Sequence, residues 1–443
     1  MNAKIIVRQN LLILLSICCS CVPNISKAQS GWTEDECIQY AIGHNLWMRN
    51  KQLDTQVAMT DVVAAYGRFL PSVHTVGVLG KRFGRSIDPR TNQYTSDSFL
   101  ESTVGLNISL PVFEGFTHVN KLQFYRLNKE ISMLESKVEE NSLAFEVLDA
   151  FYRYCFDKEI HNLAVEQRKL SEYYCGRMFE YVNLGMRSQS DLQEVKARLQ
   201  SDIYQETAKS NACRLSLLAL KELMNMKDAD TLSVVMEDEG IEPEMCPLSV
   251  NGLYAVSESV LPEFHMMKVK EKISRKSLSI ANGALYPSIR MEFNLHTGYY
   301  GGIAPFREQL NNNMSKYVGV SISLPLFNGL SRWGSIRKER LRLQQIRNEN
   351  ERQRLSLYKE IDNTCLSFSA AFQECRLAKE QYRADSITWK ESEEKWKEGM
   401  ISVFELLEKR NRYIRVKAEI VRTQLQYNLQ KRLIRFYQKG TFL

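Results

Sequence analysis

The sequence predicts a mixed α and β membrane protein in which strand pairs from several copies of the chain close a transmembrane β-barrel, and long coiled helices continue that barrel. Three observations predict this fold class. A stretch of sequence at residues 104–115 returns at residues 318–329. Apolar and polar residues alternate around both occurrences, and a long stretch without proline follows each of them. We therefore expect two repeats of one structural unit in the 443-residue chain.

Composition argues against two other classes of protein. Charged residues make up 25% of the chain, and no apolar run after the N-terminus approaches the ~20 residues that a membrane-spanning helix needs. A formal net charge of +7 is mild for a chain of this length and gives no support for nucleic-acid binding. We therefore expect neither a helical membrane protein nor a nucleic-acid-binding protein.

The N-terminus has the pattern of a secretory signal peptide. Lys4 and Arg8 form a basic start, residues 11–19 are mostly apolar, and Ser26-Lys27-Ala28 offers a cleavage site framed by small residues. We expect residues 1–28 to be removed. A lipid-modified cysteine is the competing interpretation, because three cysteines lie in this region: Cys18, Cys19 and Cys21. It is less favoured because Ile17, directly before Cys18, is not the small residue expected next to a lipid-modified cysteine.

The remaining cysteines and the histidines predict no reactive site. Seven cysteines follow residue 28, an odd number without a Cys-x-x-Cys pair, so neither a disulfide framework nor a zinc site is expected. We expect small buried hydrophobic residues at these positions: Cys37, Cys155, Cys175, Cys213, Cys246, Cys365 and Cys375. The six histidines are scattered, and the chain has no phosphate loop or nucleophile elbow. We expect no enzyme activity, no cofactor and no metal.

The internal repeat is clearest where residues 104–115 (VGLNISLPVFEG) return as residues 318–329 (VGVSISLPLFNG). Nearly the same offset relates Gly67 to Gly283. Several matches in one order at nearly one spacing do not arise by chance. The expected organisation is a first repeat over residues 29–227, a linker over residues 228–247 and a second repeat over residues 248–443.

Each repeat contains a predicted pair of strands, over residues 71–113 and 287–327. In the second pair, Ile289, Met291, Phe293 and Leu295 alternate with polar residues. This period of two, over roughly 10 residues, is typical of a membrane barrel with an apolar outside and a polar inside. A solvated antiparallel sheet on a globular core is the alternative. Polar loops are expected between the strands, over residues 83–97 and 298–316.

Long helices are predicted for the rest of each repeat. Proline is absent from residues 117–184 and 331–398, which would extend about 100 Å as helices. Return helices are expected over residues 188–227 and 402–439, and shorter arms over residues 33–69 and 248–285. Helices of this length need a narrow apolar seam, and one advances in steps of three and four: Tyr358, Ile361, Cys365, Phe368, Phe372 and Cys375.

Four strands in one chain cannot close a barrel, and unpaired strand edges are costly in lipid. Two copies would supply eight strands and a filled interior, whereas three would supply twelve strands around a water-filled lumen. We therefore expect a trimer whose helices extend the tube. Four prolines are expected at the junctions between strands and helices, where the direction of the chain changes: Pro71, Pro111, Pro287 and Pro325.

Residues from both repeats resemble the TolC-like outer-membrane efflux family. The resemblance is carried by the duplicated motifs of residues 110–115 and 324–329, by the opening residues 32–37, and by the spacing from Leu184-Gly185-Met186 to Asp191. It implies a homotrimer in outer-membrane lipid, with a twelve-stranded barrel and a periplasmic helical barrel. It also implies a periplasmic adaptor protein and an inner-membrane pump of the RND or ABC class as partners, in efflux or type I secretion.

The resemblance also assigns roles at the periplasmic tip. It implies that Gly185 and Gly399 lie in the turns that the adaptor contacts. Acids of the closed gate would be Asp191, Glu405 and Glu408, and solvated acids on a helix surface are the alternative interpretation. The family's locking arginine is replaced by Ile401, while Arg187 occupies the matching place in the first repeat. Trp396 completes the gate candidates, although tunnel-wall aromatics more often serve in packing.

One alternative function remains after an enzyme is set aside. A periplasmic coiled-coil adaptor would also be secreted and would also work with a pump. Such a protein would carry compact β domains around a single helical hairpin. The strands here come as two isolated pairs and the long hairpin comes twice, which favours a duct. The sequence predicts neither the exported substrate nor the class of pump.

Overall fold

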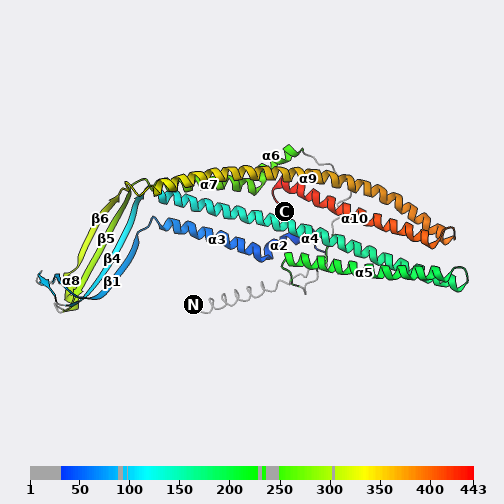
Figure 1. The fold of residues 1–443 in the computed structure, drawn as a ribbon, viewed down its shortest axis with the longest axis horizontal. Helices are drawn as coiled ribbons and strands as arrows, with labels where there is room; N and C mark the ends of the chain where they lie inside the picture. Colours follow the sequence, from blue (N-terminus) through cyan, green and yellow to red (C-terminus); the bar gives the residue numbers. More distant parts are fainter. Residues whose placement is uncertain (1–30, 88–92, 97, 228–231, 236–248, 302–304) are drawn as a thin grey trace, which may run out of the picture. The chain divides into compact units, whose positions relative to one another are not determined.

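A computed structural model describes residues 31–87, 93–96, 98–227, 232–235, 249–301 and 305–443 (Figure 1). The expected signal peptide over residues 1–28 and most of the expected linker over residues 228–247 lie outside these ranges, as does Cys246. The described residues form a mostly helical structure with a small antiparallel sheet. They fall into two compact units, drawn from residues 1–41 with 150–242 and from residues 42–149 with 243–443.

Nine helices are described: α2 (Glu34–His44), α3 (Leu46–Gly67), α4 (Thr117–Asn183), α5 (Gln189–Leu223), α6 (Val250–Val260), α7 (Pro262–Gly283), α8 (Phe306–Asn312), α9 (Ser331–Lys397) and α10 (Val403–Lys439). The long helices α4 and α9 have 67 residues each, which corresponds to about 100 Å. No helix in the described part of the chain is long and apolar enough to cross a membrane.

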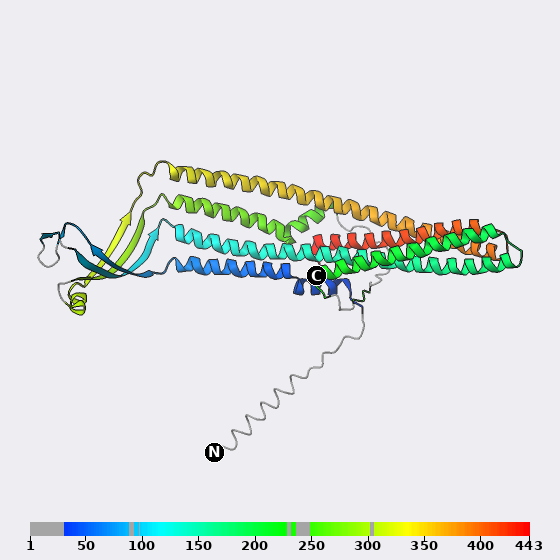
Figure 2. The ribbon, with the colours of Figure 1, turned by 60° about the horizontal axis from the view of Figure 1, so that its bottom comes forward.

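The described strands are β1 (Ser72–Arg82), β4 (Phe99–Glu114), β5 (Ser288–Tyr300) and β6 (Ser315–Ser323), with a short hairpin of β2 (Ser86–Ile87) and β3 (Tyr94–Thr95). The four long strands form one antiparallel sheet in the order β1-β4-β5-β6. Figure 2 shows the helices α3, α4, α7 and α9 continuing from one end of these strands. The edge strands β1 and β6 are the most exposed of the four.

The register of the sheet gives it one apolar face and one polar face. Ile108, Phe293 and Val318 lie opposite one another on β4, β5 and β6. One residue along, Asn107 pairs with Asn294 on the other face. Because side chains alternate in a strand, the apolar residues of β4, β5 and β6 come together on one side. Strand β1 follows the pattern less strictly, since Val78 lies on the polar side. The period of two in the sequence therefore correctly predicted that apolar residues from both halves of the chain share one face of the sheet.

Helix α8 is a departure from the sequence-based expectation. Residues 298–316 were expected to form a loop, but β5 continues to Tyr300 and α8 folds back on it. The Gln309 side chain is buried and makes two hydrogen bonds with the backbone of Tyr300, accepting from its N–H and donating to its carbonyl, each 3.0 Å long. The Thr297 hydroxyl donates to the Leu310 carbonyl at 2.6 Å. These side-chain bonds fix the connection between β5 and β6.

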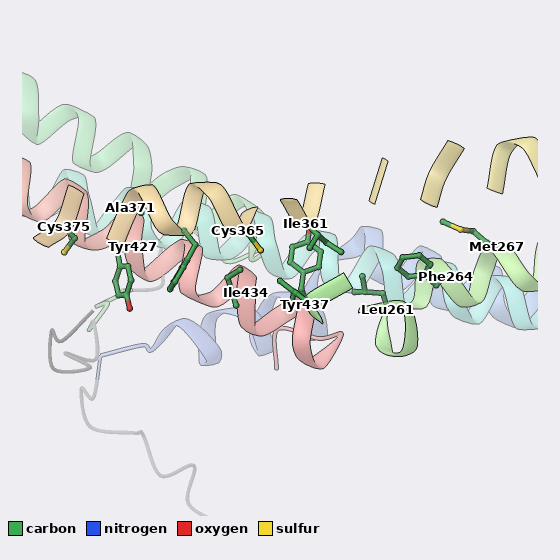
Figure 3. Packing of buried hydrophobic residues seen from close by; sticks show 12 residues of the cluster. Leu261, Phe264, Met267, Ile361, Cys365, Ala371, Cys375, Tyr427, Ile434 and Tyr437 are labelled. Atoms are coloured by element: carbon green, nitrogen blue, oxygen red, sulfur yellow. The ribbon is translucent and has the colours of Figure 1, made fainter. Parts of the chain in front are cut away.

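The core of the larger unit forms where α6 and α7 pack on α9 and α10 (Figure 3). Four residues of the predicted seam lie in it, namely Ile361, Cys365, Phe368 and Cys375, and Phe372 packs against it. The end member Tyr358 is more exposed, and its hydroxyl donates to the Asn251 side chain at 3.2 Å. The steps of three and four therefore identified the buried face of α9.

The smaller unit places α4 against α5 around a buried carboxylate. Asp202 is 1% exposed and accepts hydrogen bonds from Gln167 at 2.6 Å and from Ser171 at 2.5 Å. Arg198, one turn earlier on α5, lies 3.4 Å from the same carboxylate. A buried charge is tolerated only when its oxygens have such partners. This cluster fixes the register between the two helices of the hairpin.

Most of the described cysteines are buried. Cys37, Cys155, Cys365 and Cys375 are buried, and Cys175 and Cys213 are half-buried, and all six are free thiols. Burial is the main cause that raises the pKa of Cys37 and of Cys155 to about 12. Because only the thiolate is a strong nucleophile, both side chains stay unreactive near neutral pH. The expectation of small buried hydrophobic residues agrees with these positions.

Candidate functional site at the helix turns and the sheet junction

Two helical hairpins turn through the same backbone motif. After α4, the N–H of Gly185 donates to the Val182 carbonyl at 3.0 Å, and the N–H of Met186 donates to the Tyr181 carbonyl at 2.9 Å. Gly185 has a φ of +72°. This is a Schellman motif, which satisfies the last carbonyls of a helix and requires a left-handed residue. Glycine meets that requirement without steric strain.

The second hairpin repeats this geometry at Gly399, with a φ of +76°. Its N–H donates to the Trp396 carbonyl at 3.0 Å, and the N–H of Met400 donates to the Lys395 carbonyl at 2.8 Å. The two glycines that the family resemblance assigns to the tip therefore lie in turns of the same type. Both turns are exposed.

The return helices begin with serine caps that involve two of the gate candidates. At the start of α5, the N–H of Asp191 donates to the Ser188 hydroxyl at 3.1 Å, and the Asp191 carboxylate accepts from the Ser188 N–H at 3.3 Å. This is a capping box. At the start of α10, the N–H of Glu405 donates to the Ser402 hydroxyl at 3.2 Å. Both acids also lie where the helix dipole favours a negative charge.

The other gate candidates have different surroundings. Glu405 and Glu408 are exposed on one face of α10, while Leu406 and Leu407 between them are buried. Arg187 is exposed in the first turn. Trp396, by contrast, is only 5% exposed, so its side chain is a packing residue within its own unit. Sequence reasoning had named it as a gate candidate and had also noted this alternative.

Sequence reasoning missed the apolar surface of the turns. Leu184 and Met186 flank Gly185 and are 72% and 67% exposed. In the second hairpin, Met400 is 69% and Phe404 is 63% exposed. Both turns therefore hold large apolar side chains in contact with solvent. The signal was available, because apolar residues stand on both sides of a glycine where the helix must end.

The four prolines lie close to the ends of the long strands, but not all at a strand terminus. Pro71 and Pro287 directly precede β1 and β5, and Pro325 follows β6. Pro111 lies inside β4, at a shift of register between Pro111 and Phe113. A bulge accommodates the missing N–H there, so β4 continues to Glu114. Pro111 was expected at the junction between a strand and a helix, and it lies instead inside β4, before the strand ends at Glu114.

Two left-handed residues in succession lead into each long helix. Gly115 and Phe116 each have a φ of +60°, and Gly329 and Leu330 have values of +64° and +67°. A left-handed conformation is unfavourable for Phe and Leu by roughly 1–2 kcal/mol. Such strain persists only where neighbouring structure imposes it. The chain therefore makes the same sharp bend after β4 and after β6.

Metal binding has no site in the described residues. No group of three or more His, Cys, Asp or Glu side chains in these ranges is placed to hold an ion.

The fold is that of TolC-like outer-membrane channels. No family model matches the chain, and no curated protein matches it in sequence. The CmeC outer membrane channel of Campylobacter jejuni superimposes with a TM-score of 0.80 at 13% identity, over 92% of this chain and 85% of that chain. The MtrE outer membrane channel of Neisseria gonorrhoeae gives 0.77 at 16%, over 93% and 89%. VceC of Vibrio cholerae gives 0.76 at 12%, over 93% and 97%.

These comparisons confirm the resemblance of fold that the duplicated motifs predicted. Identities this low show the fold alone. The roles of individual residues therefore rest on this chain's own geometry.

The turn geometry generates a prediction for Gly399→Ala. A Cβ at a φ of +76° should destabilise the protein by about 1–2 kcal/mol. The matched control is Gly334→Ala inside α9, where no atom lies within 4 Å of the added Cβ and alanine should stabilise by roughly 0.5–1 kcal/mol. Thermal unfolding in detergent, followed by circular dichroism, measures both. Equal stabilisation by the two changes would contradict the left-handed turn.

Proposed function

We propose that this protein is a passive outer-membrane duct, which carries solutes from the periplasm to the exterior as a homotrimer. The observation that carries the proposal is a four-stranded sheet with one apolar face, one polar face and two open edges, joined directly to long helices. In a membrane the apolar face meets lipid and the edges need partner strands. Three copies give a twelve-stranded barrel with room for a lumen.

The polar face of the sheet supports an aqueous lumen. Its charged groups are paired along the sheet: Arg82 with Glu101 at 2.7 Å, and Arg290 with Glu114 at 2.9 Å. The Ser321 hydroxyl donates to Glu292 at 3.4 Å. Moving ion pairs from water into hydrocarbon costs several kcal/mol per ion, so these pairs favour a water-filled side of the sheet. The fold likeness to known outer-membrane channels supports the same conclusion.

We further propose that the chain is a signal peptide over residues 1–28 and two repeats, over residues 29–227 and 248–443, joined by a linker over residues 228–247. The repeated turns at Gly185 and Gly399 and the repeated bends at Gly115 and Gly329 support this organisation.

The exposed apolar turns support coupling to a periplasmic adaptor protein and, through it, to an inner-membrane pump. Leu184, Met186, Met400 and Phe404 are expensive to leave in water, and an adaptor hairpin would cover them. The chain itself is less well explained as the adaptor. An adaptor has one hairpin, whereas this chain has the two hairpins α4–α5 and α9–α10 and the fold of the duct.

Assembly is the first test of this proposal. Purified protein in detergent should sediment as a trimer, because β1 and β6 each leave one edge without a partner strand. Reconstituted protein should also conduct ions across a planar bilayer. A stable monomer without conductance would contradict the duct.

The sheet faces generate the second test. Phe293→Arg or Ile322→Arg on the apolar face should cost roughly 2–4 kcal/mol near the bilayer midplane and reduce insertion into the outer membrane. Asn294→Arg is the matched control, because it lies next to Phe293 in β5 on the polar face. The amount of each variant in outer-membrane fractions is the measurement. Equal insertion of all three would contradict the assignment of the faces.

The third test concerns the assignment of Glu405 and Glu408 to a periplasmic gate. If these exposed carboxylates ring the periplasmic constriction, they attract cations and repel anions there. Glu405→Gln with Glu408→Gln should then weaken cation selectivity and block by periplasmic divalent cations in planar bilayers. Trimer stability should stay near wild type, because exposed acids contribute little to packing.

A matched control for the gate is Glu391→Gln with Glu394→Gln, which removes two exposed acids three residues apart on α9. Selectivity and block should be unchanged in it. If the Glu405 and Glu408 variant behaves like this control, both residues lie on the outer helix surface and the gate assignment fails while the duct stands.

A further inference from the structure

The two outer pairings of the sheet have the same register. The offset that carries Gly67 to Gly283 also carries β1 onto β5, and the offset that carries Val104 to Val318 carries β4 onto β6. With these offsets, each of the nine pairs between β5 and β6 matches a pair between β1 and β4. Ser72 opposite Ser109, for example, corresponds to Ser288 opposite Ser323. The sheet therefore repeats itself residue for residue, with the pairing of β4 with β5 at its centre.

The central pairing has no counterpart within one chain. Its equivalent would join β6 to β1, and these two strands lie at opposite edges of the sheet. Only a second copy of the chain can supply that partner. The register of the pairing between β4 and β5 can then be transferred to the pairing between β6 and β1, because β6 corresponds to β4 and β1 corresponds to β5 by the two offsets given above. Asn107 opposite Asn294 becomes Ser321 opposite Val78 of the next copy.

A close approach of two glycines accompanies the central pairing. A Cβ on Gly283 would lie 2.4 Å from the Thr117 hydroxyl and 2.8 Å from the Gly115 carbonyl. Only glycine fits there. The equivalent residues are Gly67 and, across the missing pairing, Gly329 and Ser331. Around both Gly67 and Gly329 no atom lies within 4 Å of an added Cβ, and Gly67 does not have a positive φ.

An aromatic contact repeats the same pattern. Phe116 packs edge-on against Tyr286, with ring centroids 6.1 Å apart. The equivalent residues are Leu330 and Leu70, and each is 66% exposed in a single chain. Leu330 also keeps a strained left-handed backbone, as Phe116 does. The contacts within one chain do not explain why position 67 is a glycine or why Leu70 and Leu330 are large apolar residues at exposed positions.

We infer that β6 of one copy pairs antiparallel with β1 of the next, with Ser321 opposite Val78, and that Gly67 and Leu70 of that next copy pack against Gly329 and Leu330. We call this contact the subunit junction. It rests on the proposed trimer and adds its residue-level geometry. The same register sets Val320 opposite Leu79 on the apolar face, so the apolar surface continues from copy to copy. Because the two edges differ, the subunit junction is directional and a ring must close it.

Disulfide trapping tests the register. Val78→Cys with Ser321→Cys in one chain should give covalent dimers and trimers on a non-reducing gel after mild oxidation in membranes. A reductant should convert these species back to monomers. Each single variant controls for the native cysteines. Asn107→Cys with Asn294→Cys is the matched intrachain pair, and it should lose both thiols without forming larger species.

Two shifted pairs complete the experiment. Val78→Cys with Ile322→Cys is one residue out of register and on opposite faces, so the ladder should be lost. Val78→Cys with Ser323→Cys is two residues out on the same face, and a ladder from it in place of the expected pair would overturn the register. If no pair cross-links while sedimentation shows a trimer, the subunit junction is wrong and the duct stands. A monomer in sedimentation would overturn the proposed function itself.

The glycine contact has its own test, in which the direction of the change in thermal stability decides between the two roles of Gly67. Alanine stabilises a helix relative to glycine, so Gly67→Ala at the end of α3 should raise thermal stability if the residue only ends a helix. If Gly67 packs against the next copy, the same change should instead lower the temperature at which trimers dissociate on a gel. Gly43→Ala in α2, also with open space around its Cβ, is the control that should not lower it. A rise for both variants would remove Gly67 from the subunit junction.

Discussion

The backbone hydrogen bonds at the two edges of the sheet are the constraint on which the rest of this structure depends. In water, an open edge is a tolerable feature of a small sheet. In hydrocarbon, each unpaired N–H or carbonyl group is unfavourable by several kcal/mol, and only a closed set of strands avoids that cost. A chain with four strands cannot close by itself. Oligomerisation is therefore a condition of insertion for the proposed duct.

The same constraint explains the unusual backbone at the ends of the strands. The proposed tube changes from strands to helices, and it must redirect every chain segment there without leaving buried backbone groups unpaired. Here a bulge at Pro111 and the left-handed pair of Gly115 and Phe116 make that change after β4, and the close approach to Gly283 leaves no room for side chains. The long helices inherit their starting direction from this junction, and the turns at Gly185 and Gly399 reverse it at the far end.

Period and repetition made much of this predictable from the sequence. Alternation predicted the apolar face around Phe293, and steps of three and four predicted the buried face of α9 around Ile361. What escaped prediction depends on single side-chain contacts that have no period. Helix α8 is held by Gln309 on the backbone of Tyr300, and the Asp202 cluster joins residues of two different helices. The exposed Leu184 and Met400 were missed for a different reason, because each lies beside a glycine that ends a helix and that signal was present in the sequence.

The caps of the return helices bear on which acids can serve a gate. Asp191 uses its carboxylate to complete a capping box, so part of its charge is engaged by a local N–H and its position is set by α5. Glu405 donates only its backbone N–H to Ser402, and Glu408 lies one turn further along the same exposed face. A cap of that kind orients the start of α10 while leaving the Glu405 carboxylate outside the bond. The second hairpin is therefore better suited than the first to present a pair of carboxylates to passing ions.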